Sequence, residues 1–256
     1  MKQNIQYFLP FLLAFFPLAL LGQDASDSSV GAVIVVASEG KVSLLGAKES
    51  DPSTELKVGE VIPQGRFLQT DQGSKLTLLL SNGTLLTVQE KTKMKVGSFK
   101  QTPFDSQGKK VADLEGEPSN SAVELDMDFG SLVVKTKKLN KGSSFNINSP
   151  TGTAGVRGTE FQLAQNPGAG VQLDVTESTV AFTPPGGQPM PVSQGQGLDV
   201  SSTGQISPRP VNPAVAQNIT ATNQAATEVS ADISMDAVSD AMAETAEMSS
   251  ESDAGG

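Results

Sequence analysis

Short apolar runs, separated by Gly, Pro, Asn and Asp, repeat along the chain between residues 30 and 206. Many runs are rich in Val, Ile, Thr and Phe, and none belongs to a sustained 3.6-residue apolar period, so the pattern predicts β-strands. The predicted strands are 33–36, 41–45, 67–70, 75–80, 85–90, 95–99, 123–127, 131–136, 144–148, 159–164, 171–176, 179–182 and 197–200. The polar residues 100–122 are expected to form a long loop or insertion. We therefore expect an all-β domain, sandwich- or solenoid-like, made of short antiparallel strands.

Residues 75–90 carry the clearest hairpin signal, with apolar segments on both sides of the pair Asn82-Gly83. Asn-Gly favours a two-residue type I′ turn, because both central residues of that turn adopt positive φ. Such a turn would place Leu80 opposite Leu85. Since both strand faces are apolar near the turn, we expect other elements to cover the hairpin on both sides.

The N-terminal residues 1–22 have the layout of a secretory signal peptide. Lys2 precedes the apolar run 7–21, and Gly22 and Ala25 are candidate cleavage points. The run is shorter than the roughly 20 residues that span a bilayer, and two prolines interrupt it, so cleavage is favoured over a retained anchor. We expect a periplasmic or secreted protein with no transmembrane span after signal cleavage.

The character of the chain changes after residue 206, where prolines appear and the strand pattern ends. Arg209 is the last basic residue, and acidic and small apolar residues then recur every four positions from Glu228 and Val229 onward. Like charges at this spacing weaken a helix, so we expect disorder, or a nascent helix that could form on a partner. The expected organisation is a signal peptide at 1–22, a flexible lead-in at 23–29, a β domain at 30–206 and an acidic tail at 207–256.

The composition narrows the possible chemistry. The chain has 28 acidic and 18 basic residues, no His, no Cys and no Trp. The commonest general base, thiolate nucleophiles, disulfides and metal sites built on Cys or His are therefore excluded. The sequence also contains no Gly-rich phosphate loop and no Gly-x-Ser-x-Gly elbow. We expect a protein that is not an enzyme and has no cofactor.

Two charged clusters remain as candidate binding features. Glu124, Asp126 and Asp128 alternate, so they share one face of a strand, which is either a solvated acidic face or a site that gathers Ca²⁺. Four lysines fall within residues 135–141. Nucleic-acid binding would need more charge and stacking aromatic residues, so we expect a lysine-protected edge strand and no nucleic-acid partner.

The segment SPTGTAGVRGTEF, residues 149–161, contains the most specific motif of the sequence. It resembles the signature of FecR-type domains, which ends in Val-Arg-Gly-Thr-x-Phe. The Asn-Gly hairpin before it and the glycine-rich turn at 192–197 agree with the same family, so the resemblance covers about residues 58–200. The motif residues are Gly155, Val156, Arg157, Gly158, Thr159, Glu160 and Phe161.

The best-known FecR proteins are envelope regulators. They join a cytoplasmic sigma-factor-binding domain, one transmembrane helix and an extracytoplasmic FecR domain that meets an outer-membrane receptor. In this chain we expect only the β domain, so the resemblance implies protein contact outside the cytoplasm rather than direct control of a sigma factor. The leading expectation is a non-enzymatic exported protein that makes protein–protein or envelope contacts, with a possible place in cell-surface signalling. The alternative is an extracytoplasmic ligand-binding or scaffold module for a glycan or Ca²⁺.

The motif also has a direct interpretation. Gly155 and Gly158 permit positive φ and close backbone approach, which favours a bulge or a tight crossing that leads into the next strand. Arg157 then has two possible roles. It either clamps carbonyls or a carboxylate, such as that of Glu160 or Glu177, or it is an exposed anchor for an anionic partner.

Overall fold

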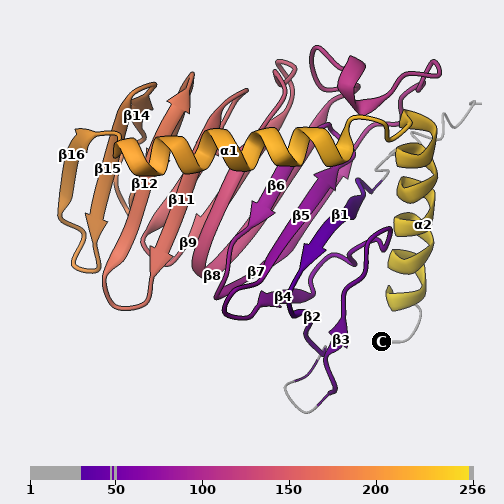
Figure 1. The fold of residues 1–256 in the computed structure, drawn as a ribbon, viewed down its shortest axis with the longest axis horizontal. Helices are drawn as coiled ribbons and strands as arrows, with labels where there is room; N and C mark the ends of the chain where they lie inside the picture. The colour runs from indigo at the N-terminus through magenta and orange to yellow at the C-terminus, as the bar shows by residue number, and fades with distance from the viewer. Residues whose placement is uncertain (1–29, 47, 49–50, 254–256) are drawn as a thin grey trace, which may run out of the picture.

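The computed structural model describes residues 30–46, 48 and 51–253. These residues are mostly β-strand, in one large mixed sheet, with two helices at their C-terminal end (Figure 1). The predominance of β-strand predicted from the sequence is thus confirmed. The predicted signal peptide 1–22 and lead-in 23–29 lie outside the described residues.

The strands follow the chain in the order labelled in Figure 1. Their bounds are β1 Val33–Glu39, β2 Val42–Leu44, β3 Thr54–Glu55, β4 Phe67–Thr70, β5 Lys75–Leu80, β6 Leu85–Val88, β7 Thr92–Gln101, β8 Ser121–Lys135, β9 Ser144–Ser149, β10 Gly152–Val156, β11 Glu160–Asn166, β12 Gly170–Glu177, β13 Thr179–Thr183, β14 Met190–Ser193, β15 Gln196–Ser201 and β16 Ile206–Pro210.

The long strand β8 belongs to two layers of strands and joins them. Its first half pairs with β7 and β9, and its second half pairs with β6 and β11. The first layer has the order β3-β2-β4-β7-β8-β9-β10-β13-β14, and the second has the order β1-β5-β6-β8-β11-β12-β15-β16. Gly130 lies where β8 changes layers. Its φ is +110°, and a Cβ there would collide with Thr92, so this bend requires glycine.

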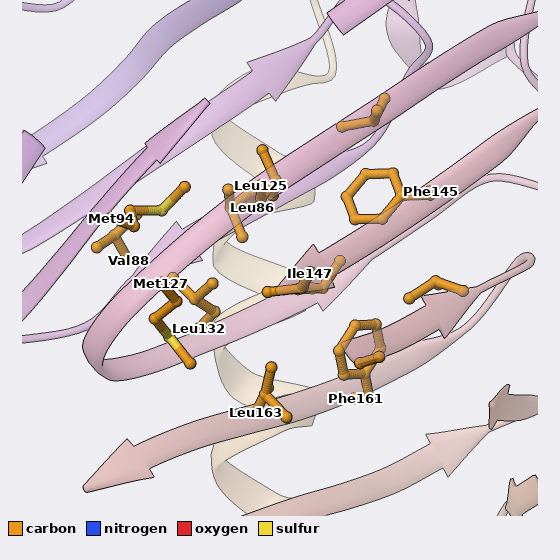
Figure 2. Close-up of a cluster of buried hydrophobic side chains, with 14 of the residues drawn as sticks. Leu86, Val88, Met94, Leu125, Met127, Leu132, Phe145, Ile147, Phe161 and Leu163 are labelled. Carbon is orange, nitrogen blue, oxygen red and sulfur yellow. The ribbon is translucent and has the colours of Figure 1, made fainter. Parts of the chain in front are cut away.

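The main core lies between the two layers. Alternate side chains of each strand point inward, as the two-residue period of a strand requires. Figure 2 shows Phe145 and Ile147 of the first layer meeting Phe161 and Leu163 of the second. All four are buried, with at most 1% of the side chain exposed, so the FecR-like motif contributes directly to the core through Phe161.

The hairpin of β5 and β6 is present, but its predicted register is wrong by one residue. Leu79, not Leu80, lies opposite Leu85. The connection is a three-residue loop, in which the Gly83 N–H donates to the Leu80 carbonyl (2.8 Å). Gly83 alone has positive φ, +83°, whereas Asn82 does not, so the turn is not type I′. Both hairpin faces are buried, as expected.

Four strands were missed, and two predicted strands are parts of one. The segments 123–127 and 131–136 both belong to β8. The missed strands are β3, β10, β14 and β16. β3 has two residues, β10 is made of small residues, and β14 and β16 contain prolines, which are tolerated in edge strands. The prediction of a lysine-protected edge at 135–141 is wrong, because β8, which ends at Lys135, has neighbours on both sides.

The tail is helical where disorder or a weak helix was expected. Helix α1 (Pro213–Ser230) crosses the outer face of the second layer, and α2 (Met235–Asp253) lies at the end beside β1 (Figure 1). The sequence suggested an apolar stripe that includes Val229, but Val229 is 49% exposed, so α1 meets the sheet with a different face. The buried residues of α1 are Ile219, Asn223, Ala226 and Ser230.

Arg209 fixes the point where α1 begins. Its guanidinium binds both carboxylate oxygens of the buried Asp174 (2.5 and 2.8 Å) and one oxygen of Asp199 (2.9 Å). Asp174 also accepts a hydrogen bond from the backbone N–H of Asn212, the N-cap residue of α1 (3.1 Å). The hydrogen bonds to Asp174 raise the pKa of Arg209 above its ordinary value.

The predicted loop 100–122 lies against the start of α2. It contains one 3₁₀ turn, Val111–Asp113, and its backbone forms hydrogen bonds with the residues around the junction of α1 and α2. Within the described part of the chain, neither helix is long and apolar enough to cross a membrane.

Candidate functional site

The motif 155–161 carries the chain from the first layer to the second. Its first two residues end β10 (Gly152–Val156), and its last two begin β11 (Glu160–Asn166). Gly158 lies in the crossing with φ +80°, and a Cβ there would come within 3.2 Å of the Lys138 backbone. Glycine is therefore needed at this position for both conformation and space.

Thr159 fastens the crossing to the segment that follows β8. Its backbone N–H donates to the Thr136 hydroxyl (2.7 Å), and its carbonyl accepts from the Thr136 N–H (3.0 Å). Thr159 is 1% exposed, so these bonds are shielded from water. They fix where the crossing enters the second layer.

Glu160 connects the motif to helix α1. Its carboxylate lies 3.0 Å from the Lys135 ammonium and accepts a hydrogen bond from the Asn223 amide of α1 (3.1 Å). The next residue, Phe161, faces the core between the layers. Alternation along β11 thus places one motif side chain under α1 and the next in the core.

Arg157 lies at the surface of the crossing. Its guanidinium donates one hydrogen bond to the Asn140 carbonyl (3.2 Å). This contact is with a backbone carbonyl and leaves both roles considered for Arg157 open. Glu160, one of the carboxylates considered as a partner of Arg157, instead forms an ion pair with Lys135. Arg157 is exposed, so the guanidinium is available to an anionic group outside the chain.

Glu117 is a buried carboxylate that the sequence did not single out. One of its oxygens accepts from the Ser121 hydroxyl (2.6 Å), and the other accepts from the Asn140 backbone N–H (2.6 Å) and the Ser143 hydroxyl. The residue is 7% exposed. Hydrogen bonds from several donors offset the cost of burying its charge.

The network around Glu117 joins the two sequence motifs. The Asn82 amide of the hairpin loop donates to the Ser121 hydroxyl (3.1 Å), which in turn donates to Glu117. On the other side, Glu117 accepts a hydrogen bond from the Asn140 N–H, and the carbonyl of Asn140 accepts one from Arg157. We call this set of five residues the polar network. It brings the hairpin turn and the FecR-like motif to one end of the molecule.

The only sequence signal for this network was indirect. Residues 117–121, Glu-Pro-Ser-Asn-Ser, place one acid among short polar side chains inside an apparently featureless loop. Asn140 contributes through its backbone, so its side-chain identity could not have revealed it.

The acidic face predicted on β8 is present, and its members are paired. Glu124 accepts from two asparagine amides of β9, whereas Asp126 lies near Lys95 (3.5 Å) and Asp128 near Lys93 (2.9 Å). Within the described ranges, no three acidic residues form a group that could hold a metal ion. This face therefore gives no support to a Ca²⁺ site.

The structure is a two-layer β domain in which a segment containing Gly158 connects one layer to the other. The family model described as FecR protein matches residues 66–181, a range that includes both the hairpin and the motif. The chain therefore contains a FecR domain over these residues, and the resemblance seen in the sequence is confirmed.

Other comparisons are more distant. No curated protein matches this sequence. Two crystal structures of a "putative anti-sigma factor" from Parabacteroides distasonis ATCC 8503, at 1.65 and 2.50 Å resolution, align with 17% identity and a TM-score of 0.45. Each alignment covers 62% of this chain and 64% of the other, so the chain spans less than two thirds of those proteins' length.

Proposed function

We propose that this protein is an exported, non-catalytic regulatory protein whose FecR domain acts by binding another protein in the cell envelope. The observation that carries the proposal is the FecR match over residues 66–181, together with the exposure of Arg157 at the centre of the family motif. Because Arg157 is connected through Asn140 to the buried Glu117, a partner bound there contacts an ordered part of the domain. An arginine suits a partner that presents a carboxylate or another anion.

The chemistry of the chain supports a binding role over a catalytic one. The sequence has no His and no Cys, so general-base and thiolate chemistry would fall to other residue types. Among the described residues, the buried Glu117 is already bound by three donors, and the acids of β8 are paired with amides and lysines. Glu117 does line a pocket between the long loop and Met235, but both of its oxygens already accept hydrogen bonds, so it is not free to act as a general base.

Export is tested by the N-terminus of the protein in its native cell. Envelope fractionation followed by N-terminal sequencing should yield a chain that starts close to Gly22 or Ala25. A chain that retains residues 1–21 and remains in the cytoplasmic fraction would show that the proposed location is wrong.

Partner binding is tested with purified mature protein as bait in envelope extract. We expect an enriched protein that is retained at moderate salt and lost when the bait carries Arg157→Ala. The matched control is Arg66→Ala, because Arg66 also binds a backbone carbonyl, that of Leu45 (2.5 and 3.0 Å), but lies outside the motif. If both variants keep or both lose the partner, the motif is not the contact site.

A further inference from the structure

Helices α1 and α2, with their short connection, form an arm of residues 213–253 that covers apolar side chains on the outside of the second layer (Figure 1). We call these body side chains the outer patch. They come from β1, β5, β6 and the 3₁₀ turn of the long loop, and they are Val36, Leu79, Leu85 and Val111. The arm residues packed against them are Ala226, Met235 and Val238.

The arm is separate from the main core. The cluster of buried side chains between the two layers consists of body residues, and none of its described members comes from the arm. The strand pairings are likewise made within the body. The body therefore keeps its own core and its hydrogen-bonded sheet if the arm moves away.

Two further contact regions lie away from the outer patch. Ala241 and Met242 of α2 form a small apolar cluster with Ala32 of the body, whereas the first half of α1 is attached mainly by polar contacts. Asn218 donates to Gln162 (3.0 Å), and Asn223 donates to Glu160 (3.1 Å). Between the patch and Arg209, Ile219 is the one large apolar side chain that α1 buries. Polar contacts exchange with water at little net cost, so this half of the interface opposes separation weakly.

The contacts at the start of α2 are also partly exposed to water. Lys110 and Asp232 form an ion pair (2.7 Å) in which the side chains are 53% and 93% exposed. The backbone N–H of Val111 donates to the Ile233 carbonyl (2.9 Å). Exposed ion pairs contribute little to stability, so the outer patch supplies most of the attachment here.

We propose that the arm is a reversible cover, which opens as a unit while the two-layer body stays folded and thereby uncovers the outer patch and Glu160. The occupant of the patch in the closed state is the chain's own α1–α2 junction. Opening exposes an apolar surface next to a motif carboxylate, which gives the protein a second state with a different binding surface. The inference rests on the packing of the arm and stands whether or not Arg157 binds a partner.

The test uses the absence of cysteine from the sequence, because any introduced thiol is then the single reactive one. Ala226→Cys places a thiol under the arm, where the native side chain is 2% exposed, and Ala154→Cys places one in the main core, at 0%. Val58→Cys is the open reference, since Val58 is 63% exposed. Maleimide labelling rates are measured on the full chain without denaturant and with increasing urea.

We expect the thiol at 226 to react about 100-fold faster than the thiol at 154, and with a weaker dependence on urea, because local opening exposes less surface than unfolding. Equal rates and equal urea dependence at both positions would mean that the arm opens only when the whole protein unfolds. A rate at 226 equal to that at 58 would mean that the arm is not closed in solution. Either result overturns the proposal.

Two further variants guard against perturbation by the introduced thiol. In the Ala226→Cys background, Ile219→Ala should raise the labelling rate about tenfold, since it removes a buried contact of the arm. Val229→Ala, on the exposed side of the same helix, should leave it unchanged.

Hydrogen exchange of the unmodified chain should show faster exchange in 214–230 than in β11 and β12, and equal protection in these segments would contradict reversible opening.

Discussion

Glu117 is the residue on which the end of the β body near the FecR motif depends. Its carboxylate receives hydrogen bonds from Ser121, the first residue of β8, and from Asn140 and Ser143, which lie between β8 and β9. Its removal would leave these donors unpaired in a buried site, and each unpaired group is costly. The residue therefore matters for folding, although no sequence motif includes it.

We expect Glu117→Ala to lower the free energy of unfolding by about 2–4 kcal/mol. Urea denaturation measures this change. Glu115→Ala is the control, because Glu115 lies two residues away, is exposed and should change stability by no more than about 0.5 kcal/mol. Equal effects of the two substitutions would show that the buried hydrogen bonds are not important for stability.

Arg157 should behave differently from Glu117. Its exposed side chain makes one hydrogen bond to a carbonyl, so Arg157→Ala should cost no more than about 1 kcal/mol of stability while weakening partner binding. Thermal unfolding and affinity measured on the same preparations separate the two effects. A large fall in melting temperature with unchanged affinity per folded molecule would assign the residue a purely structural role.

At the scale of elements, strands with large β-branched or apolar residues were predictable, and strands held by their neighbours were not. β4 and β5 have the predicted bounds. β10, with the sequence Gly-Thr-Ala-Gly-Val, has little strand propensity and forms because β9 and β13 pair with it on both sides. The hairpin register was wrong because the Asn82 side chain bonds within the loop and favours a three-residue connection.

The two C-terminal helices were also not predictable from local sequence, because tertiary contacts stabilise them. The four-residue repeat of acids in the tail argued against a stable isolated helix, and local propensity supports that reasoning. The structure differs because burial of Ile219, Ala226, Met235 and Val238 against the body stabilises the helices through tertiary contacts. The Arg157 motif could be found from sequence, whereas its connection to Glu117 needed the fold.

The ion pair between Lys110 and Asp232 makes the arm contact depend on pH. The hydrogen bond from Lys110 lowers the pKa of Asp232 below its ordinary 3.8, and the same bond raises the pKa of Lys110 above 10.5, with a further contribution from Asp113. The contribution of Asp232 is therefore complete above its ordinary pKa and is lost as pH falls through the lowered value. The contribution of Lys110 is complete below 10.5 and is lost as pH rises through the raised value.

This pair predicts a small pH-dependent difference between the native chain and Asp232→Asn. The native chain should have a slightly higher melting temperature between about pH 5 and pH 9, and the difference should shrink toward zero at about pH 2. Because both side chains are exposed, high salt should also reduce it. A difference that persists unchanged at low pH would show that the ion pair is not its cause.

Prolines in the last strand of each layer disfavour pairing of these edges with other chains. β14 contains Pro191, and β16 contains Pro208 and Pro210. Just after β16, the Val211 N–H donates to the Gly195 carbonyl, on the side of β15. Because backbone groups alternate in direction along a strand, those of Pro208 and Pro210 face the open edge, where each residue lacks an N–H. Such edges cannot readily accept an added strand.

We expect the double variant Pro208→Thr, Pro210→Thr to self-associate more strongly than the native chain, because it restores two donors at the open edge. Sedimentation or light scattering as a function of concentration measures this change. Pro184→Thr, in the loop between β13 and β14, should have no such effect. If the double variant stays monomeric wherever the native chain does, the prolines do not protect the edge.

At the scale of the whole molecule, two layers joined by β8 place the FecR motif, the hairpin loop and the long loop at one end. The arm covers the outer face of the second layer, the face away from the core between the layers (Figure 1). The domain therefore presents one exposed motif arginine on a well-ordered crossing. This arrangement supports a protein that works through contact with a partner.

The most direct test of that claim is photocrosslinking in the native cell. A photoreactive amino acid replaces Arg157 in one strain and Thr203, an exposed residue in the loop between β15 and β16, in another. We expect one discrete protein adduct in the envelope from position 157 and none of the same mass from position 203. Folded protein in the envelope that gives no adduct at 157, or the same adducts at both positions, would contradict the account.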